Sequence, residues 1–420
     1  MRKKVLFKVV AGLVIVSTFV SACGSSGATD STKSSSSSAN AGSTGGGKGN
    51  DFKIGLLTDL TGAYSSAFLT SEKGVQAYVN VANAAGGIAG HKISYVVGDT
   101  TSTAAGAVTA AQRMVQNDKV DAIIDVSALF SAAEPFLLKN NIPVLGGGFD
   151  GPEWTVPTNT NLFDTVGTVD YNKLSSAIGD YMKASGVTSC GSIGYANASS
   201  GPSATAIVNS CKHAGLKGGY LNAQLPAGST DMGPIAIAIK NAGVDGLELP
   251  VVPNTAFALV AALEQLGVKL KVVLLATGYG GDLLASDATV TAAQGYQFSS
   301  VGAPIEANTA ATQKFAAALK TVGITGAPTF AEQEAYVAMA ALEAGLKGAG
   351  TTATGESLMK SLRNVHDFDA DGLLAPGKVD FANFSQFGGG GGAAGCIFAA
   401  VLKGKAFEVA PNSPTCGTNV

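Results

Sequence analysis

Three histidines and one run of aspartates are the residues of this chain that could most readily do chemistry. His91, His213 and His366 lie in separate segments, and none belongs to a recognisable nucleophile–base arrangement. The sequence also lacks the GxSxG, HExxH and CxxC motifs of hydrolases, metalloproteases and thiol oxidoreductases. We therefore expect neither an enzyme nor a bound cofactor.

The segment DFDADG, residues 367–372, has carboxylates at alternate positions before a glycine, as a calcium-binding EF-hand loop begins. The twelfth position of such a loop needs a bidentate glutamate, but this chain has Lys378 there. We expect a polar turn and no metal site. The glycine run 388–392 lacks the Gly-Lys-Ser/Thr ending of a phosphate-binding loop, so we interpret it as a flexible loop.

Apart from Cys23, the chain has four cysteines, which allow three pairings. Pairing of sequence neighbours would join Cys190 to Cys211 and Cys396 to Cys416, and an exported chain permits such disulfides. A metal site needs closely spaced ligands, and only His213 lies near any of these cysteines. Structural disulfides are therefore favoured over a metal site or free thiols.

The segments that would position binding residues alternate between strands and helices. Residues 53–58 form an apolar run that ends in a turn, which indicates a buried strand. Apolar residues recur at spacings of three and four over 71–85, which predicts a helix, and the adjacent Gly86 and Gly87 suit its C-terminal cap. Further strands are expected at 92–99, 120–125 and 142–148, with helices at 103–117 and around Ser131. This alternation predicts right-handed crossovers and a parallel sheet.

The pattern repeats after the passage 151–168, which holds the only tryptophan, Trp154. We predict helices at 171–185, 202–214, 231–241 and 255–266, and strands at 189–195, 218–223, 244–251 and 271–278. The steps NDKVDAIID and NAGVDGLEL share a polar helix end, Val-Asp and an apolar strand, which supports two like-folded halves. Beyond residue 295 we expect helices at 309–322, 330–345 and 356–363, a strand at 377–381 and a hairpin within 396–410.

Three stretches together carry a resemblance to a known family: KIGLLTDLTGAYSS, KGVQAYVNVANAAGGIAGHKISYVVGD and AAQRMVQNDKVDAIIDVSALFSAAEPFLLKNNIPVL. In this order they resemble the periplasmic branched-chain amino acid binding proteins, the type I solute receptors of ABC importers. The resemblance implies an α/β fold of two Rossmann-like lobes with parallel-sheet cores, joined by interlobe crossovers. It assigns residues 51–166 and 300–372 to lobe 1, and residues 167–299 and 373–420 to lobe 2.

Ligands of open parallel sheets bind outside the carboxyl ends of the strands. The loops at those ends give the lobe 1 candidates Tyr64, Ser65, Ser127, Ala128, Phe149 and Asp150. By resemblance, Ser127 and Ala128 stand where amino acid binders hold the ligand's α-carboxylate, although Ser127 is equally suited to be a helix N-cap. By resemblance, amino acid binders carry a hydroxyl residue at about the position of Asp150, where it contacts the ligand's carboxylate. An ionised Asp at this position would repel that carboxylate. Either the ligand lacks that group or Asp150 is a turn residue that points elsewhere.

In lobe 2 the corresponding candidates are Asn197, Ser200, Val252 and Tyr279. Amino acid binders of the family place an acid in the last of these loops to pair with the ligand's ammonium, and here Tyr279 stands at or beside that position. Tyr279 and Trp154 either stack on an apolar or planar ligand or pack in the core. These departures disfavour a leucine-like ligand.

The N-terminus is predicted to be a targeting segment. A basic start precedes a 12-residue apolar core, Val9 to Val20, which is too short to cross a hydrocarbon layer of ~30 Å as a helix. Because Val20-Ser21-Ala22-Cys23 resembles a bacterial lipobox, we predict a lipoprotein signal peptide at 1–22 and lipidation of Cys23. Residues 23–50 then form a Ser/Gly-rich tether, or a glycosylated stalk of the same composition.

Charge narrows the choice of partners. Residues 1–22 hold 4 of the 27 basic residues and no acid, which leaves 23 basic against 30 acidic residues and a net charge of −7, so nucleic acid is disfavoured. We expect a monomeric, lipid-anchored extracytoplasmic protein that binds a small polar ligand, an amino acid or a related compound such as an amide, and delivers it to ABC permease subunits. A ligand-sensing receptor module and an exported hydrolase remain as alternatives.

Overall fold

The computed structural model describes residues 49–167 and 169–420, which belong to one compact unit. The predicted signal peptide, Cys23 and nearly all of the predicted tether lie outside the described residues. No helix in the described ranges is both long and apolar enough to cross a membrane.

A five-stranded parallel sheet with the order β2-β1-β3-β4-β5 forms the core of lobe 1. Its central strands, β1 (Phe52–Thr58) and β3 (Ala122–Val126), are buried almost throughout, because helices cover both faces of the sheet. The other strands are β2 (Ile93–Asp99), β4 (Val144–Gly146) and β5 (Leu162–Asp164).

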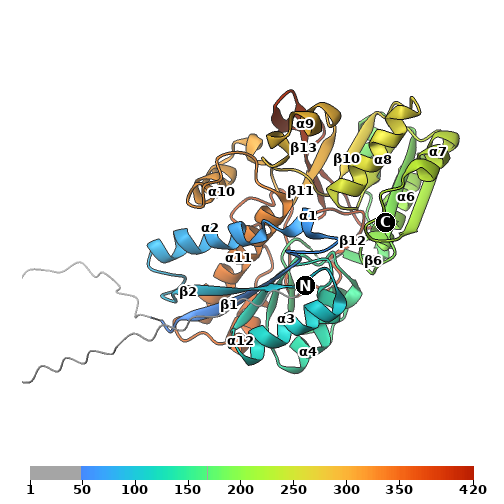
Figure 1. Ribbon diagram of the computed structural model, residues 1–420. Helices are drawn as coiled ribbons and strands as arrows, with labels where there is room; N and C mark the ends of the chain where they lie inside the picture. Colours follow the sequence, from blue (N-terminus) through green and yellow to red (C-terminus); the bar gives the residue numbers. More distant parts are fainter. Residues whose placement is uncertain (1–48, 168) are drawn as a thin grey trace, which may run out of the picture. The chain divides into compact units, whose positions relative to one another are not determined.

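Helices pack on both faces of this sheet (Figure 1). α2 (Ser71–Ala84) and α11 (Phe330–Ala349) cover one face, and α3 (Ala104–Gln116) and α4 (Glu134–Lys139) cover the other. α12 (Gly355–Leu362) packs against α11, and α10 (Ala310–Lys320) packs against α2. The predicted alternation of strands and helices in lobe 1 is therefore confirmed.

The sheet of lobe 2 repeats the same order. Its parallel part runs β8-β7-β9-β10-β11, and β13 and β14 extend it as antiparallel strands. The strands are β7 (Ser189–Tyr195), β8 (Lys217–Leu225), β9 (Gly246–Leu249), β10 (Val272–Leu275), β11 (Gln297–Ser300), β13 (Cys396–Lys403) and β14 (Ala406–Val409).

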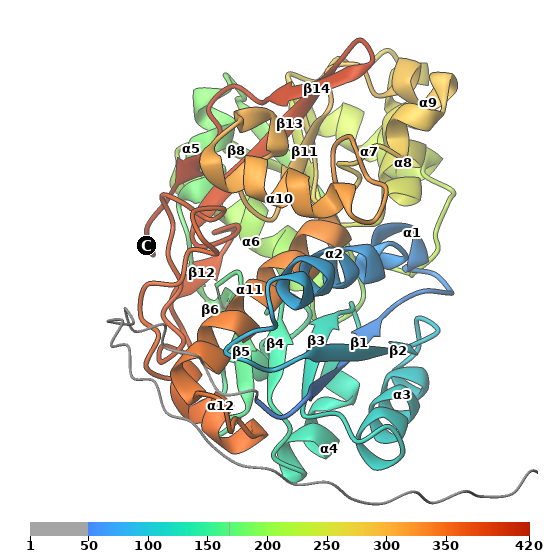
Figure 2. The same ribbon diagram turned by 90° about the vertical axis from the view of Figure 1, so that its left-hand side faces the viewer.

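Helices again cover both faces of the lobe 2 sheet. α5 (Ala177–Ala184) and α6 (Ser200–His213) lie on one face, whereas α7 (Gly233–Ala242) and α8 (Pro253–Gln265) lie on the other. The short α9 (Asp287–Ala292) precedes β11. Figure 2 shows helices α2 and α11 between the sheet of lobe 1 and the sheet of lobe 2.

The Val-Asp step shared by the two halves has the same structural role in each lobe. Asp121 accepts a hydrogen bond from the backbone N–H of Lys53 at 2.8 Å, at the start of β1. Asp245 accepts the corresponding bond from the N–H of Ser189 at 2.8 Å, at the start of β7. In each lobe this carboxylate fixes the first strand to the third, so the predicted likeness of the two halves holds in the structure.

Three sequence-based expectations were wrong. The first part of the helix expected at 171–185 is strand β6 (Val169–Leu174), because it pairs with β12 (Phe387–Gly389). The glycine run 388–392 therefore begins as a strand and is not a free loop. The segment 377–381 forms only an isolated bridge between Val379 and Phe368.

The aspartate run 367–372 is a polar turn, as expected. Lys378, which occupies the twelfth position, lies 4.0 Å from Asp367, and Lys314 pairs with Asp371 at 2.5 Å. Within the described ranges, no group of three or more His, Cys, Asp or Glu residues could hold a metal ion.

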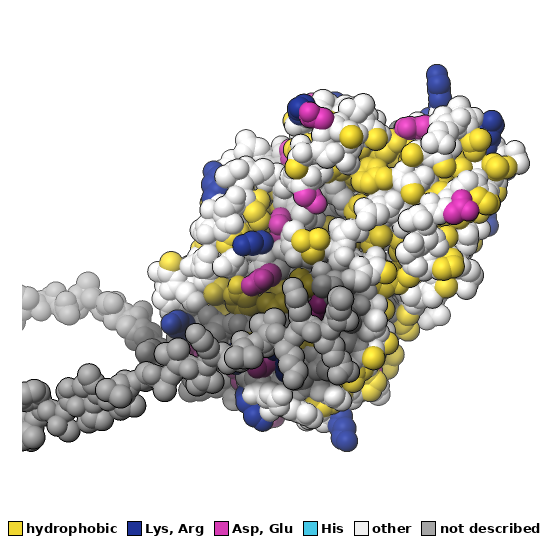
Figure 3. Space-filling view, in the orientation of Figure 1, with side chains coloured by type: hydrophobic (Ala, Val, Ile, Leu, Met, Phe, Trp, Pro, Cys, Tyr) yellow, Lys and Arg dark blue, Asp and Glu magenta, His cyan; other side chains and the backbone are white. Residues whose placement is uncertain are grey.

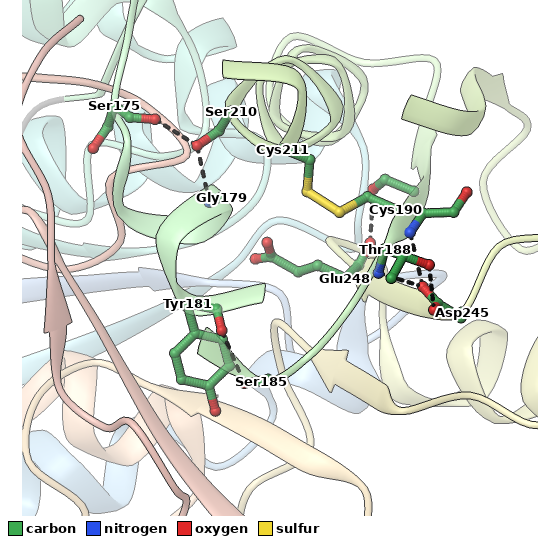
Figure 4. Close-up of a disulfide and its surroundings, with 12 residues drawn as sticks. Ser175, Gly179, Tyr181, Ser185, Thr188, Cys190, Ser210, Cys211, Asp245 and Glu248 are labelled. Atoms are coloured by element: carbon green, nitrogen blue, oxygen red, sulfur yellow. Dashed lines mark hydrogen bonds between the residues drawn. A yellow bond between two sulfur atoms is a disulfide. The ribbon is translucent and has the colours of Figure 1, made fainter. Parts of the chain in front are cut away.

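Both expected disulfides are present, which excludes metal ligation and free thiols for these four cysteines. Cys190 of β7 is bonded to Cys211 of α6, which ties a strand to the helix above it (Figure 4). Cys396 is bonded to Cys416 of β15 (Thr415–Cys416), which ties the C-terminal segment to β13.

Few charged side chains appear on the face of the molecule drawn in Figure 3. On the face drawn in Figure 3, Lys, Arg, Asp and Glu side chains are scattered, and apolar side chains gather in the upper half between the regions of α8 and α9. This distribution follows from a chain with only 14% charged residues.

Candidate functional site

A cavity of about 220 Å³ lies between the two lobes, at the carboxyl ends of their strands. At ~30 Å³ per water molecule it has the volume of roughly seven waters, which suits a small solute. Its lining comes from both lobes and from the crossing segments, and is mainly apolar. The polar or ionisable members are Tyr64, Tyr171, Tyr195, Asn197, Ser199, Ser200, Ser203, Glu248, Thr277, Ser299, Ser300 and Glu334.

Most of the residues expected at the site do line this cavity. They are Tyr64, Ala128, Phe149, Asn197, Ser200 and Val252. Ser65, Ser127, Asp150 and Tyr279 do not line it. Ser65 instead donates a hydrogen bond to the carbonyl of Gly62 at 2.9 Å, within the loop that precedes α1 (Ser65–Phe68).

A direct hydrogen bond joins the lobes across the cavity. The Nδ2 of Asn197, in lobe 2, donates to the hydroxyl of Tyr64, in lobe 1, at 3.3 Å. The Asn197 side chain is itself fixed, because its Oδ1 accepts from the N–H groups of Ser199 at 3.1 Å and Ser200 at 2.7 Å. Two predicted site residues thus meet, and they hold the lobes together.

The group expected to receive a ligand carboxylate already holds a carboxylate of the protein. Ser127 Oγ donates to Asp59 Oδ1 at 2.9 Å, and the N–H of Ala128 donates to Asp59 Oδ2 at 2.8 Å. Thr100 donates the third hydrogen bond to this carboxyl group, at Oδ1. Ser127 also accepts from the N–H of Leu129 at 3.0 Å, but it is not a helix N-cap, because that position before the 3-10 helix η1 (Phe130–Ala132) belongs to Leu129.

Asp150 is buried and does not line the cavity. Its Oδ1 accepts from Trp154 Nε1 at 2.5 Å, and the indole packs on Phe130 with ring centroids 5.0 Å apart. Burial, and then the nearby Glu153, raise the pKa of Asp150 well above its usual range. Asp150 and Trp154, which lies in the short 3-10 helix η2 (Pro152–Thr155), therefore belong to the lobe 1 core.

Tyr279 is likewise a core residue. Its hydroxyl donates to Glu306 at 2.5 Å and accepts from the N–H of Ile305 at 3.3 Å, and its ring packs edge-on against Phe407. The side chain is fully buried. It links lobe 2 to residues 305 and 306, which lie in the range 300–372 assigned to lobe 1, and it does not line the cavity.

Aromatic rings form much of the cavity wall. Phe149 stacks on Phe68 with centroids 6.4 Å apart and meets Phe330 edge-on at 5.9 Å. Tyr64 meets Tyr195 of lobe 2 edge-on at 5.8 Å. Both lobes thus contribute rings, and sequence reasoning had found only Phe149 and Tyr64.

Two glutamates of the cavity wall were also missed. Glu248 lies in the middle of β9, and Glu334 lies in the first turns of α11. Oε2 of Glu248 and both carboxyl oxygens of Glu334 are buried and have no hydrogen-bond partner within the described part of the chain. In Figure 4 no dashed line reaches the Glu248 carboxylate. The signal in the sequence was an acid within each of two largely apolar stretches, Glu248 in GLELPVV and Glu334, with Glu332, in FAEQEAYVAM.

Burial changes the protonation of these acids. It raises the pKa of Glu248 to about 8. It also raises the pKa of Glu334 well above the usual range, and the charge of Asp164 adds to this effect. Asp125, at the end of β3, is buried too, and its pKa is raised by burial and then by Asp150 and Glu334.

Glycines let the backbone approach these acids and the cavity. A Cβ on Gly147 would lie 1.8 Å from Oε1 of Glu334. Gly392 has φ +67° and would place a Cβ 2.3 Å from the carbonyl of Cys396. Gly390, Gly391 and Gly392 line the cavity, so the last part of the glycine run is a packed wall of the site.

Comparisons with known proteins agree with this geometry. A family model described as periplasmic binding protein matches residues 51–405. A search of curated proteins finds no match.

Solved structures show the same fold at low sequence identity. A benzoate complex of a solute-binding protein from R. palustris superimposes with a TM-score of 0.71 at 17% identity, covering 88% of this chain and 97% of that one. The isoleucine complex of LivJ from Streptococcus pneumoniae has a TM-score of 0.69 at 20% identity, covering 88% and 99%. A fatty acid transporter substrate-binding protein from Thermomonospora curvata has a TM-score of 0.70 at 20% identity, covering 87% and 92%.

Proposed function

Because the chain belongs to the periplasmic binding protein family, we propose that it is the solute-binding lipoprotein of an ABC importer and holds its solute in the interlobe cavity. Members of this family are extracytoplasmic, bind small molecules and work with ABC permease components, and they are not enzymes. The prediction of a protein without catalytic activity is therefore confirmed by the family, and the exported hydrolase is set aside.

The observation that carries the proposal is the cavity itself. Residues of both lobes line it, it lies where ligands of parallel sheets bind, and its volume suits a small solute. Two of the similar structures are complexes with benzoate and isoleucine, and a third is the binding protein of a fatty acid transporter, so the family leaves the chemical class of the solute open.

Hinge motion between the lobes is the expected mechanism. Opening breaks the hydrogen bond between Asn197 and Tyr64, and the crossing segments absorb the rotation. Closure over a solute excludes water, which strengthens the polar contacts made inside the cavity. No chemical step is needed.

Membrane attachment through Cys23 and a monomeric state complete the proposal. Two or more acyl chains at Cys23 would hold the protein stably at the membrane, where a single chain would be marginal. The family fits this arrangement because its members act outside the cytoplasm.

The experiment is a thermal-shift screen of the purified protein against amino acids, amides, amines, polyols, aromatic acids and purines. A true solute at ~100 times its Kd adds about 2.7 kcal/mol to the free energy of unfolding. The stabilising solute is then supplied to proteoliposomes holding the cognate permease, and uptake must depend on this protein. A stabilising solute whose uptake is unaffected by the protein would favour the sensing role and contradict the importer role.

A further inference from the structure

The ionisable side chains that line the cavity are all acids or tyrosines. Among the described residues, the lining includes Glu248 and Glu334 but no lysine, arginine or histidine. A ligand carboxylate would therefore meet no cationic side chain and would lie near two carboxyl groups. This is the reverse of what an anionic solute requires.

The two donors that the resemblance assigned to a ligand carboxylate, the Ser127 hydroxyl and the Ala128 N–H, are already used. Ser127 Oγ and the N–H of Ala128 donate to Asp59 at 2.9 and 2.8 Å. Asp59 is itself fully buried. A zwitterionic amino acid would thus lose the subsite that the resemblance assigned to its carboxylate.

The two cavity glutamates lack partners of their own. Glu334 is fully buried, and neither of its carboxyl oxygens has a hydrogen-bond partner within the described residues. Oε2 of Glu248 is also buried and has no hydrogen-bond partner within the described residues. The backbone carbonyl of Glu248, by contrast, accepts a hydrogen bond from Ser192 Oγ at 2.7 Å. Buried carboxyl groups are normally paired, so a partner supplied by the solute is the simplest way to satisfy both.

The aromatic wall favours the same kind of solute. Tyr64, Phe149 and Phe330 of lobe 1 and Tyr195 of lobe 2 line the cavity and pack against one another in pairs. Ring faces attract cations, most strongly where water is excluded, and they also pack on apolar groups.

Given the solute-binding function proposed above, on which this step rests, we propose that the cavity takes a small organic cation. The cation is an amine or quaternary ammonium compound with an apolar body. Its charge pairs with Glu248 of lobe 2 and with Glu334 of lobe 1, and its body packs on the aromatic rings.

Isothermal titration with matched compounds tests the charge directly. One series shares an aromatic ring and differs in charge: benzylamine, benzyl alcohol and benzoate. A second series shares a branched alkyl chain: 3-methylbutylamine, 3-methylbutanol and 3-methylbutanoate. Benzyltrimethylammonium is a quaternary ammonium probe. We expect the cation of each series to bind roughly 10- to 100-fold more tightly than its alcohol, as a hydrogen-bonded charge pair contributes. The carboxylates should bind most weakly.

Variants identify the counter-charge. Glu248→Gln and Glu334→Gln keep the shape of the side chain and remove its ability to become a carboxylate beside a bound cation, so each should weaken binding of the amine roughly 10-fold or more and leave binding of the alcohol unchanged. Glu306→Gln is the matched control, because Glu306 bonds Tyr279 and does not line the cavity.

Two outcomes would overturn the inference. One is tighter binding of the carboxylate or the alcohol than of the cation; the other is no binding by any cationic probe. In either case a thermal shift by some other solute would leave the proposed solute-binding function standing. Failure of every solute in the screen would count against that function itself.

Discussion

The Ser127 hydroxyl donates a hydrogen bond to the carboxyl group of Asp59, with 2.9 Å between the two oxygens. This contact places a carboxylate of the protein against the donors that the family resemblance had assigned to the ligand. It converts an expected recognition element into a structural one, and it removes the main reason for assuming an amino acid ligand.

We predict that Ser127→Ala destabilises the protein and does not weaken solute binding. The change removes one hydrogen bond from a buried carboxyl group, which costs about 1–3 kcal/mol in the free energy of unfolding. Urea unfolding and a titration with the solute found by the screen measure the two effects. Loss of affinity with unchanged stability would show that Ser127 contacts the solute after all.

Tyr279→Phe should also destabilise the protein without weakening solute binding, because the Tyr279 hydroxyl lies in the core. The hydroxyl bonds Glu306 and the N–H of Ile305 in the core, so its removal should cost about 1–3 kcal/mol in unfolding free energy and leave the Kd of the solute unchanged. Tyr64→Phe is the matched change at a cavity tyrosine, because it removes the bond to Asn197. A weaker Kd for Tyr279→Phe than for Tyr64→Phe would contradict this assignment.

Stability should fall as pH rises from about 4.5 to 7. Burial raises the pKa of Glu153 from 4.5 to about 7, so over this window the folded protein keeps a proton that the unfolded chain has released. The stabilisation is complete below pH 4.5 and is lost by about pH 7. Glu153→Gln should remove about 1–3 kcal/mol of the pH dependence. Urea unfolding at several pH values measures it, and stability that rises across this window would contradict the account.

Cys23→Ala should release the protein from membranes and leave solute affinity unchanged, because the expected acyl chains are attached at this residue and the cavity lies elsewhere in the chain. Fractionation of cells that express the full chain, followed by titration of the soluble variant, measures both. Retention of Cys23→Ala in the membrane pellet would disprove lipidation at this position.

The sequence allowed the architecture to be predicted well, because buried parallel strands and amphipathic helices leave strong periodic patterns. Strand β7 lies at the expected residues 189–195, and both disulfides join the expected neighbours. Loop positions at strand ends were also informative, since Tyr64, Phe149 and Asn197 all face the cavity.

The direction of individual side chains could not be predicted in this way. Asp150 and Tyr279 follow strands as cavity residues do, but hydrogen bonds to Trp154 and Glu306 turn them into the core. The strand β6 depends on a partner more than two hundred residues away, at Phe387–Gly389, so its local pattern was read as helix. Glu248 was overlooked because it lies within a strand instead of after it.

The most direct test of the central claim is the Kd of the stabilising solute for four proteins: wild type, Tyr64→Ala, Asn197→Ala and Tyr279→Phe. Tyr64 and Asn197 line the cavity from opposite lobes, and Tyr279 lies outside it. We predict that both cavity variants bind at least roughly 10-fold more weakly, a loss of about 1.4 kcal/mol, whereas Tyr279→Phe binds as the wild type does. An equal Kd for all four proteins would contradict binding in the interlobe cavity.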